Sequence, residues 1–154
     1  TAERAIKNAL GADSVLWLDD GMLNDHTDGH IDNIARFIGV DYVACQEAFG
    51  DDDPNREVFD KIAADLESFG FEVARIPSPG RYTNEDGDVV PASHMNFIIG
   101  NEVVVVPTYG TASTDAAVAA IQKLFPSRKV VGSPSNAILS GGGSFHCITQ
   151  QEPK

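Results

Sequence analysis

A cysteine close to the end of the chain and an acidic stretch near its start carry the residue types that perform chemistry. Cys147 follows three consecutive glycines in GGGSFHCITQQEP, residues 141–153. His30 and Asp32 lie in DHTDGHIDN, residues 25–33. A thiol nucleophile needs one group that handles protons and a carboxylate that orients the histidine or the substrate. Parts so far apart in sequence meet only in the fold, so this set predicts a nucleophilic cysteine site.

The acidic stretch allows two other interpretations. Four side chains stand at every second position, and an extended backbone would place them on one face: His26, Asp28, His30 and Asp32. Imidazole and carboxylate both bind divalent cations, so a metal-binding module is one alternative. Gly29 would interrupt a strand, however, and neither Cys-x-x-Cys nor His-Glu-x-x-His accompanies the stretch. A solvated acidic loop is the other alternative.

Composition narrows the partners. The 154 residues suit one domain with a core. The net charge of −12 argues against nucleic acid as a partner, and it either attracts a cationic small molecule or serves only solubility. No run approaches the roughly 20 apolar residues that span a membrane, and no secretory leader is recognisable, so we expect a cytoplasmic protein. Two cysteines make no disulfide framework, and Cys45 in DYVACQEAF is expected in the core.

The elements that must position these residues alternate between helix and strand. Capping residues and apolar stripes predict three helices: Thr1 to Gly11, Asp53 to Gly70 with Asp53 as cap and Pro54 in the first turn, and Ser113 or Thr114 to Pro126. Apolar or alternating runs predict strands at residues 14–18, 42–45, 71–76 and 129–134, and two more within 95–107 that join at Gly100 and Asn101. Trp17, in the first of these strands, is expected to be a core aromatic.

The order strand, helix, strand occurs twice. Each copy closes near a proline, and Pro134 follows Pro77 by 57 residues (134 − 77). Self-similarity at such a period is typical of repeated modules. The sequence therefore predicts a mixed α/β fold built from related units.

Three blocks, TDGHIDN, MNFIIGNEVVVVPTYG and GGGSFHCITQQEP, occur in this order and resemble the agmatine deiminase family and the bacterial peptidylarginine deiminases of the same fold. The resemblance covers nearly the whole chain. It implies a pentein fold, an α/β propeller of five ββαβ modules, of which this chain would hold two to three. Because full-length relatives are more than twice as long, residues 1–154 would be the C-terminal portion of one such domain.

The resemblance also implies a reaction: hydrolysis of agmatine to N-carbamoylputrescine and ammonia in putrescine and polyamine metabolism, without metal or organic cofactor. Cys147 would be the nucleophile that forms a thiouronium intermediate, and His30 the general acid and base. Asp32 would bind two guanidinium nitrogens, and Gly142 and Gly143 would lie against the planar substrate. Deimination of a peptidyl arginine by the same chemistry is the alternative.

The family uses further carboxylates from modules that precede these residues, and those missing modules are expected partners. The 154-residue segment alone is therefore expected to be inactive, and a folded but inactive fragment is the alternative of another class. Exposed strand edges would favour self-association into a homo-oligomer. His146 is interpreted as structural, because the neighbour of Cys147 on a strand would point to the opposite face.

Overall fold

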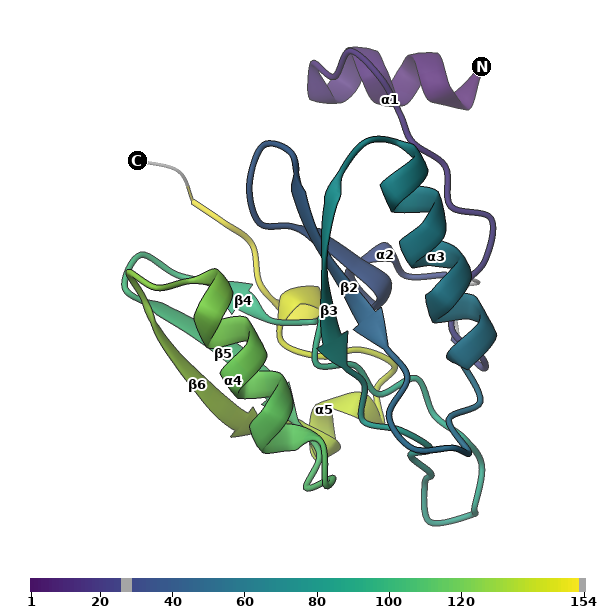
Figure 1. Cartoon of the computed structure of the whole chain (residues 1–154), viewed down its shortest axis with the longest axis vertical. Helices are drawn as coiled ribbons and strands as arrows, with labels where there is room; N and C mark the ends of the chain where they lie inside the picture. Colours follow the sequence, from purple (N-terminus) through teal and green to yellow (C-terminus); the bar gives the residue numbers. More distant parts are fainter. Residues whose placement is uncertain (26–28, 153–154) are drawn as a thin grey trace.

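The computed structural model describes residues 1–25 and 29–152. Helices alternate along the chain with strands that form two three-stranded sheets (Figure 1). The expected mixed α/β class is therefore confirmed. In chain order the elements are α1 (Ala2–Leu10), α2 (Ile31–Ile34), β1 (Ala35–Phe37), β2 (Tyr42–Glu47), α3 (Arg56–Ser68), β3 (Glu72–Pro77), β4 (Ile98–Ile99), β5 (Val103–Thr108), α4 (Thr114–Leu124), β6 (Lys129–Pro134), α5 (Asn136–Leu139) and the 3₁₀ helix η1 (His146–Ile148).

Both sheets are built by the same order of elements. A short strand pairs antiparallel with a longer strand, a helix follows, and the next strand pairs parallel: β1-β2-α3-β3 and β4-β5-α4-β6. Pro77 and Pro134 are the last residues of β3 and β6. The 57-residue offset in the sequence thus joins equivalent positions of the two copies.

The α4 helix lies between the two sheets, and α3 covers the other side of the first sheet (Figure 1). The α4 helix packs against both β3 and β6, and the core between them contains Ile76, Val104 and Ile121. A second core forms where Phe59 of α3 packs with Cys45 of β2. Cys45 is fully buried as expected, and burial raises the pKa of its thiol to about 11.

Local capping explains where the helices begin and end. Thr1 Oγ1 accepts the backbone N–H of Arg4, and Gly11 ends α1 in the left-handed conformation, so both predicted ends are confirmed. The predicted start of α3 at Asp53 is wrong. Its carboxylate accepts the backbone N–H of Asn55 in the preceding turn, and the helix begins at Arg56. Ser113, one of the two predicted caps, is the N-cap residue of α4, although its side chain makes no capping hydrogen bond.

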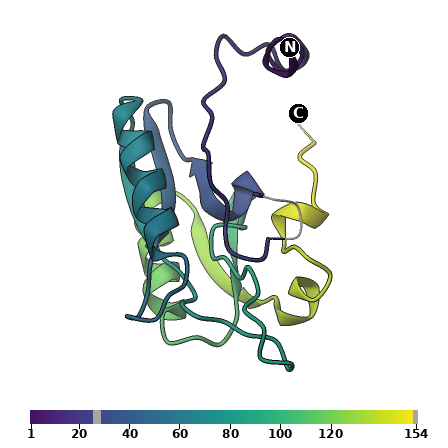
Figure 2. The same ribbon diagram turned by 90° about the vertical axis from the view of Figure 1, so that its right-hand side faces the viewer.

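The predicted strand at residues 14–18 is wrong. These residues form no regular structure, and Trp17, expected in the core, is 56% exposed. A strand needs a neighbour to bind its N–H and C=O groups, and no described strand pairs with this segment. Figure 2 shows α1, which has no buried residue, standing apart from the body. Among the described residues, no helix is both long and apolar enough to cross a membrane.

Candidate active site

Three segments that are distant in sequence meet beside η1, the yellow segment near the centre of Figure 1. Cys147 Sγ lies 3.4 Å from Asp32 Oδ2, although 115 positions separate the two residues. Asn96 Nδ2 donates to the same sulfur at 3.2 Å. The structure therefore brings the predicted nucleophile and the predicted guanidinium-binding carboxylate into contact.

Asp32 is held in α2, which begins just after His30. An extended backbone, which the one-face arrangement of the metal alternative would need, does not continue through residue 32, because a helical turn starts at Ile31. Burial alone would raise the pKa of the Asp32 carboxyl. Hydrogen bonds from His146 and Cys147, with the charges of His146 and His30, outweigh burial, and the pKa is lowered. The site thus contains a stable anion next to a thiol.

The expectation that His146 points away from Cys147 is wrong. Residues 146–148 form a 3₁₀ turn and not a strand, so neighbouring side chains need not point to opposite faces. His146 Nδ1 lies 2.6 Å from Asp32 Oδ2, the oxygen that Cys147 also contacts. His146 is therefore a direct partner of the site carboxylate.

His30, the predicted general acid and base, is anchored by a buried carboxylate. Asp25 Oδ2 accepts the backbone N–H of His30 at 2.9 Å, and Asp25 Oδ1 lies 3.3 Å from His30 Nδ1 without hydrogen-bond alignment. The electrostatic interaction between His30 and Asp32 helps to lower the pKa of the Asp32 carboxyl. Within the described part of the chain, no hydrogen bond joins His30 to Cys147.

Asn96 is the site residue that the sequence did not reveal. Its side chain is completely buried, and it contacts three parts of the site. Nδ2 donates to Asn33 Oδ1 at 2.9 Å as well as to the sulfur, and Oδ1 accepts the backbone N–H of His146 at 2.9 Å. The only hint in the sequence was that a polar residue stands within the apolar block MNFIIG. In the structure, β4 begins at Ile98, so residues 95–97 lie outside the strand.

The run of glycines permits a close approach to the nucleophile. A Cβ on Gly143 would lie 3.0 Å from Cys147 Cβ and 3.1 Å from Sγ, closer than side chains normally pack. Gly142 has φ 92°, which favours glycine. The loop thus folds back on the sulfur, while contact of Gly142 and Gly143 with a substrate stays a prediction.

A cavity of about 570 Å³ reaches the site. Asp32 and His146 contribute to its lining, and most of the remaining wall is apolar, including Leu18, Ala35 and Phe71. The guanidinium of Arg36 also belongs to the lining and Cys147 does not, so the apolar wall suits an aliphatic chain that ends beside the Asp32 carboxylate.

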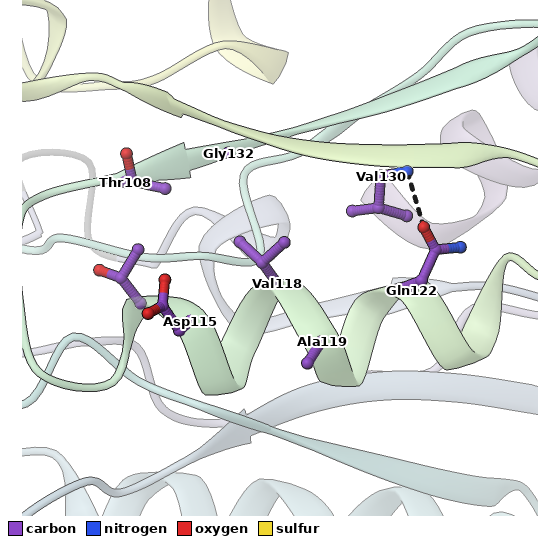
Figure 3. A pocket seen from close by; sticks show the side chains of 8 residues that line it. Thr108, Asp115, Val118, Ala119, Gln122, Val130 and Gly132 are labelled. Carbon is purple, nitrogen blue, oxygen red and sulfur yellow. Dashed lines mark hydrogen bonds between the residues drawn. The ribbon is translucent and has the colours of Figure 1, made fainter.

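A second cavity of about 500 Å³ lies between α4 and the sheet strands β5 and β6 (Figure 3). Gln122 faces this space but its Oε1 already accepts the N–H of Val130 at 3.0 Å. The lining contains one acid, Asp115, and shares no residue with the Cys147 site. The Cys147 site, and not this cavity, is therefore the candidate active site.

In residues 1–25 and 29–152, no group of three or more His, Cys, Asp or Glu side chains is arranged so that it could hold a metal ion. His26 and Asp28, half of the predicted metal set, lie outside the described residues. The metal alternative therefore stays a prediction that the described geometry does not address.

Comparisons with known proteins agree on one family. The model of the Porphyromonas-type peptidyl-arginine deiminases matches residues 1–153. Relatives carrying the name agmatine deiminase are 33% identical in Lactococcus lactis and 36% identical in Legionella pneumophila, with 99% of this chain and 48% and 46% of theirs covered.

Solved structures give the same answer. The agmatine deiminase of Enterococcus faecalis superimposes with TM-score 0.87 at 31% identity, over 98% of this chain and 47% of that one. The agmatine deiminase of C. jejuni gives TM-score 0.85 at 27% identity, over 94% and 44%. The chain thus spans about half the length of the relatives it matches.

Proposed function

Because this chain belongs to the family of Porphyromonas-type peptidyl-arginine deiminases, we propose that it forms part of an enzyme that hydrolyses a guanidinium group. The substrate we propose is agmatine, which yields N-carbamoylputrescine and ammonia. The observation that supports the proposal is the 3.4 Å contact between Cys147 Sγ and Asp32 Oδ2, because the proposed nucleophile then lies beside the proposed cation-binding carboxylate.

In the proposed reaction, Asp32 accepts N–H bonds from the substrate and fixes the plane of the guanidinium. The thiolate of Cys147 attacks the central carbon and forms an S–C bond. The C–N bond then breaks, ammonia leaves with a proton from His30, and a covalent thiouronium remains. His30 next takes a proton from water, and the oxygen attacks the same carbon. The S–C bond breaks, the new hydroxyl loses its proton to solvent, and the ureido product and the Cys147 thiolate are released.

The contacts of Asn96 and His146 suit this scheme. The Asn96 amide donates to sulfur at 3.2 Å, which would stabilise the thiolate before attack. His146 and Cys147 share one oxygen of Asp32, so the other oxygen is the one more open to a substrate N–H. No step requires a metal or an organic cofactor.

Deimination of a peptidyl arginine is the second candidate, favoured by the description of the family model itself. The chemistry at Cys147 would be unchanged, and only the groups that contact the far end of the substrate would differ. Turnover of agmatine against an arginyl peptide, followed as ureido product in the complete enzyme, chooses between them.

We further propose that residues 1–154 are the C-terminal portion of a pentein propeller, with the two β-β-α-β copies as two of its five modules. The missing modules would supply further carboxylates. The segment alone is then expected to release no ammonia from agmatine. Efficient release by residues 1–154 alone would contradict this part of the proposal. A cytoplasmic location and a homo-oligomer stay predictions.

The cation-binding role of Asp32 can be tested without turnover. Chloroacetamidine is a planar cation and chloroacetamide is its neutral counterpart, and a thiolate displaces chloride from either. We expect Cys147 to prefer the cation, and Asp32→Asn to lower this preference about tenfold. Mass spectrometry of the labelled peptide measures both rates.

Asp115→Asn is the matched control, since it makes the same charge change in the other cavity. It should leave the preference unchanged. Equal preference in the wild type and in Asp32→Asn would overturn the assignment of Asp32 as the cation-binding carboxylate.

A further inference from the structure

Arg36 lies where the two sheets meet beside the site. It is the middle residue of β1, and its Nη1 donates to the carbonyl oxygens of Phe97 at 2.8 Å and Met95 at 3.4 Å. Its Cζ lies 4.9 Å from the centroid of the Phe97 ring. One side chain of the first sheet thus binds the backbone that leads into the second.

The backbone that Arg36 binds has no other regular partner. Met95, Asn96 and Phe97 precede β4, so their carbonyls lie outside the strand pairing, and all three side chains are completely buried. Buried carbonyls require donors. Arg36 supplies them on both sides of Asn96, while the carbonyl of Asn96 itself accepts the N–H of His146 at 3.2 Å.

Asn96 connects this backbone to the sulfur through its amide contact with Cys147. Arg36 also lies within electrostatic range of the site. Burial lowers the pKa of the Arg36 guanidinium below its ordinary value, and electrostatic interactions with Asp32 and Cys147 oppose this only in part. An arginine remains protonated at neutral pH, so Arg36 is a fixed cation here.

We propose that Arg36 is a positioning residue that acts on Cys147 through Asn96. By binding the carbonyls on both sides of Asn96, it keeps the amide donor against Sγ. The inference rests on the proposed role of Cys147 as nucleophile. An N–H donated to a thiolate stabilises the reactive form, so loss of the donor slows attack by the sulfur.

The rate at which iodoacetamide alkylates Cys147 in the 154-residue chain tests this. The buried thiol of Cys45 does not compete, and mass spectrometry assigns the label. Arg36→Met is expected to slow alkylation about tenfold. Arg36→Lys keeps the charge and one donor, so it should restore part of the rate.

Arg128→Met is the matched control. Arg128 Nε donates to the carbonyl of Gly100 at 3.0 Å and its Cζ lies 5.9 Å from the Phe125 ring centroid, the same kinds of contact at the β4–β5 turn. This variant should leave alkylation unchanged. Urea unfolding of every variant separates a general loss of stability from a local effect.

A double variant decides whether Arg36 acts through Asn96. Asn96→Ala should slow alkylation as Arg36→Met does, and the two together should be no slower than Asn96→Ala alone. A further tenfold loss in the double variant would overturn the proposal, as would an unchanged rate in Arg36→Met. If Arg36→Met does not fold, Arg36→Lys takes its place in the cycle with the same criteria.

Failure of this proposal is distinguishable from failure of the proposed function. Alkylation by neutral iodoacetamide reports the surroundings of the sulfur alone. The preference for chloroacetamidine reports cation binding at Asp32. If the double-mutant cycle of Arg36 and Asn96 shows no coupling while Cys147 still prefers chloroacetamidine, only the proposed role of Arg36 is refuted.

Discussion

One oxygen of Asp32 accepts hydrogen bonds from two neighbours, and these contacts determine how the carboxyl titrates. His146 Nδ1 lies 2.6 Å and Cys147 Sγ 3.4 Å from Oδ2. They offset burial, and the pKa of Asp32 in the folded chain is lowered. Asp32 therefore contributes stability above its unfolded pKa, and this contribution is lost as the pH falls through the folded pKa.

His146→Leu is expected to raise the pKa of Asp32, because the variant removes a hydrogen bond and a charge that favour the carboxylate. Carbon-detected NMR of the Asp32 carboxyl across the acid range measures the shift. Ile148→Ala, an exposed change in the same 3₁₀ turn, is the control and should leave the titration unchanged. An unchanged Asp32 titration in His146→Leu would contradict the prediction.

The sequence was enough to predict which residues could react, but not which side chains surround them in the fold. Cys147 and Asp32 were predicted together and lie in contact. Asn96 was missed, because an amide within an apolar block has no reactive signature of its own. The orientation expected for His146 is wrong, because strand geometry does not apply to a 3₁₀ turn.

The α4 helix is the element that joins the two halves, since it packs against β3 on one side and β6 on the other. Ile121 and Ala117 of this helix are completely buried in the core between the sheets. The site lies at the border of the same two sheets. Packing of α4 therefore supports the arrangement on which the site depends.

Ile121→Ala is expected to lower the free energy of unfolding by about 2–5 kcal/mol, because it leaves a cavity between the sheets. Lys123→Ala, an exposed change on the same helix, should stay within about 0.5 kcal/mol of the wild type. Urea unfolding measures both. A loss below about 1 kcal/mol for Ile121→Ala would show that α4 does not carry this core.

Elements with local signals were predicted well. The ends of α1 and the N-cap of α4 follow from single residues such as Thr1, Gly11 and Ser113. The strand expected at residues 14–18 failed, because a strand is completed by a partner that a local pattern does not specify. The start of α3 was predicted too early for a related reason. The Asp53 carboxylate accepts a hydrogen bond from Ser78, a residue distant in sequence that a local pattern does not specify.

Across the whole molecule, His94 links the segment that carries Asn96 to the second sheet. Its Nδ1 lies 2.8 Å from the carbonyl oxygen of Pro107 in β5, and its ring is completely buried. Burial lowers the pKa of His94, although the bond to Pro107 opposes the change. The unfolded chain therefore binds this proton more readily, and stability falls as the pH drops below the unfolded value of about 6.5.

His94→Gln keeps an N–H donor for Pro107 but does not titrate. We expect the loss of unfolding free energy between about pH 7.5 and about pH 5.5 to shrink in this variant, by up to about 1.4 kcal/mol per pH unit. Urea unfolding at both pH values measures it. An equal loss in wild type and variant would mean that His94 does not govern the acid sensitivity.

The sequence by itself determined the α/β class, the repeat of its elements and the family, because periodicity, caps and ordered motifs are local properties that can be read along the chain. The tertiary structure decided that His146 and Cys147 contact Asp32, that Asn96 contacts Cys147, and that Arg36 binds the backbone on both sides of Asn96. Contacts across 115 positions depend on how two sheets pack around one helix. That packing depends on polar and apolar groups from distant segments meeting in the fold, and no local pattern contains it.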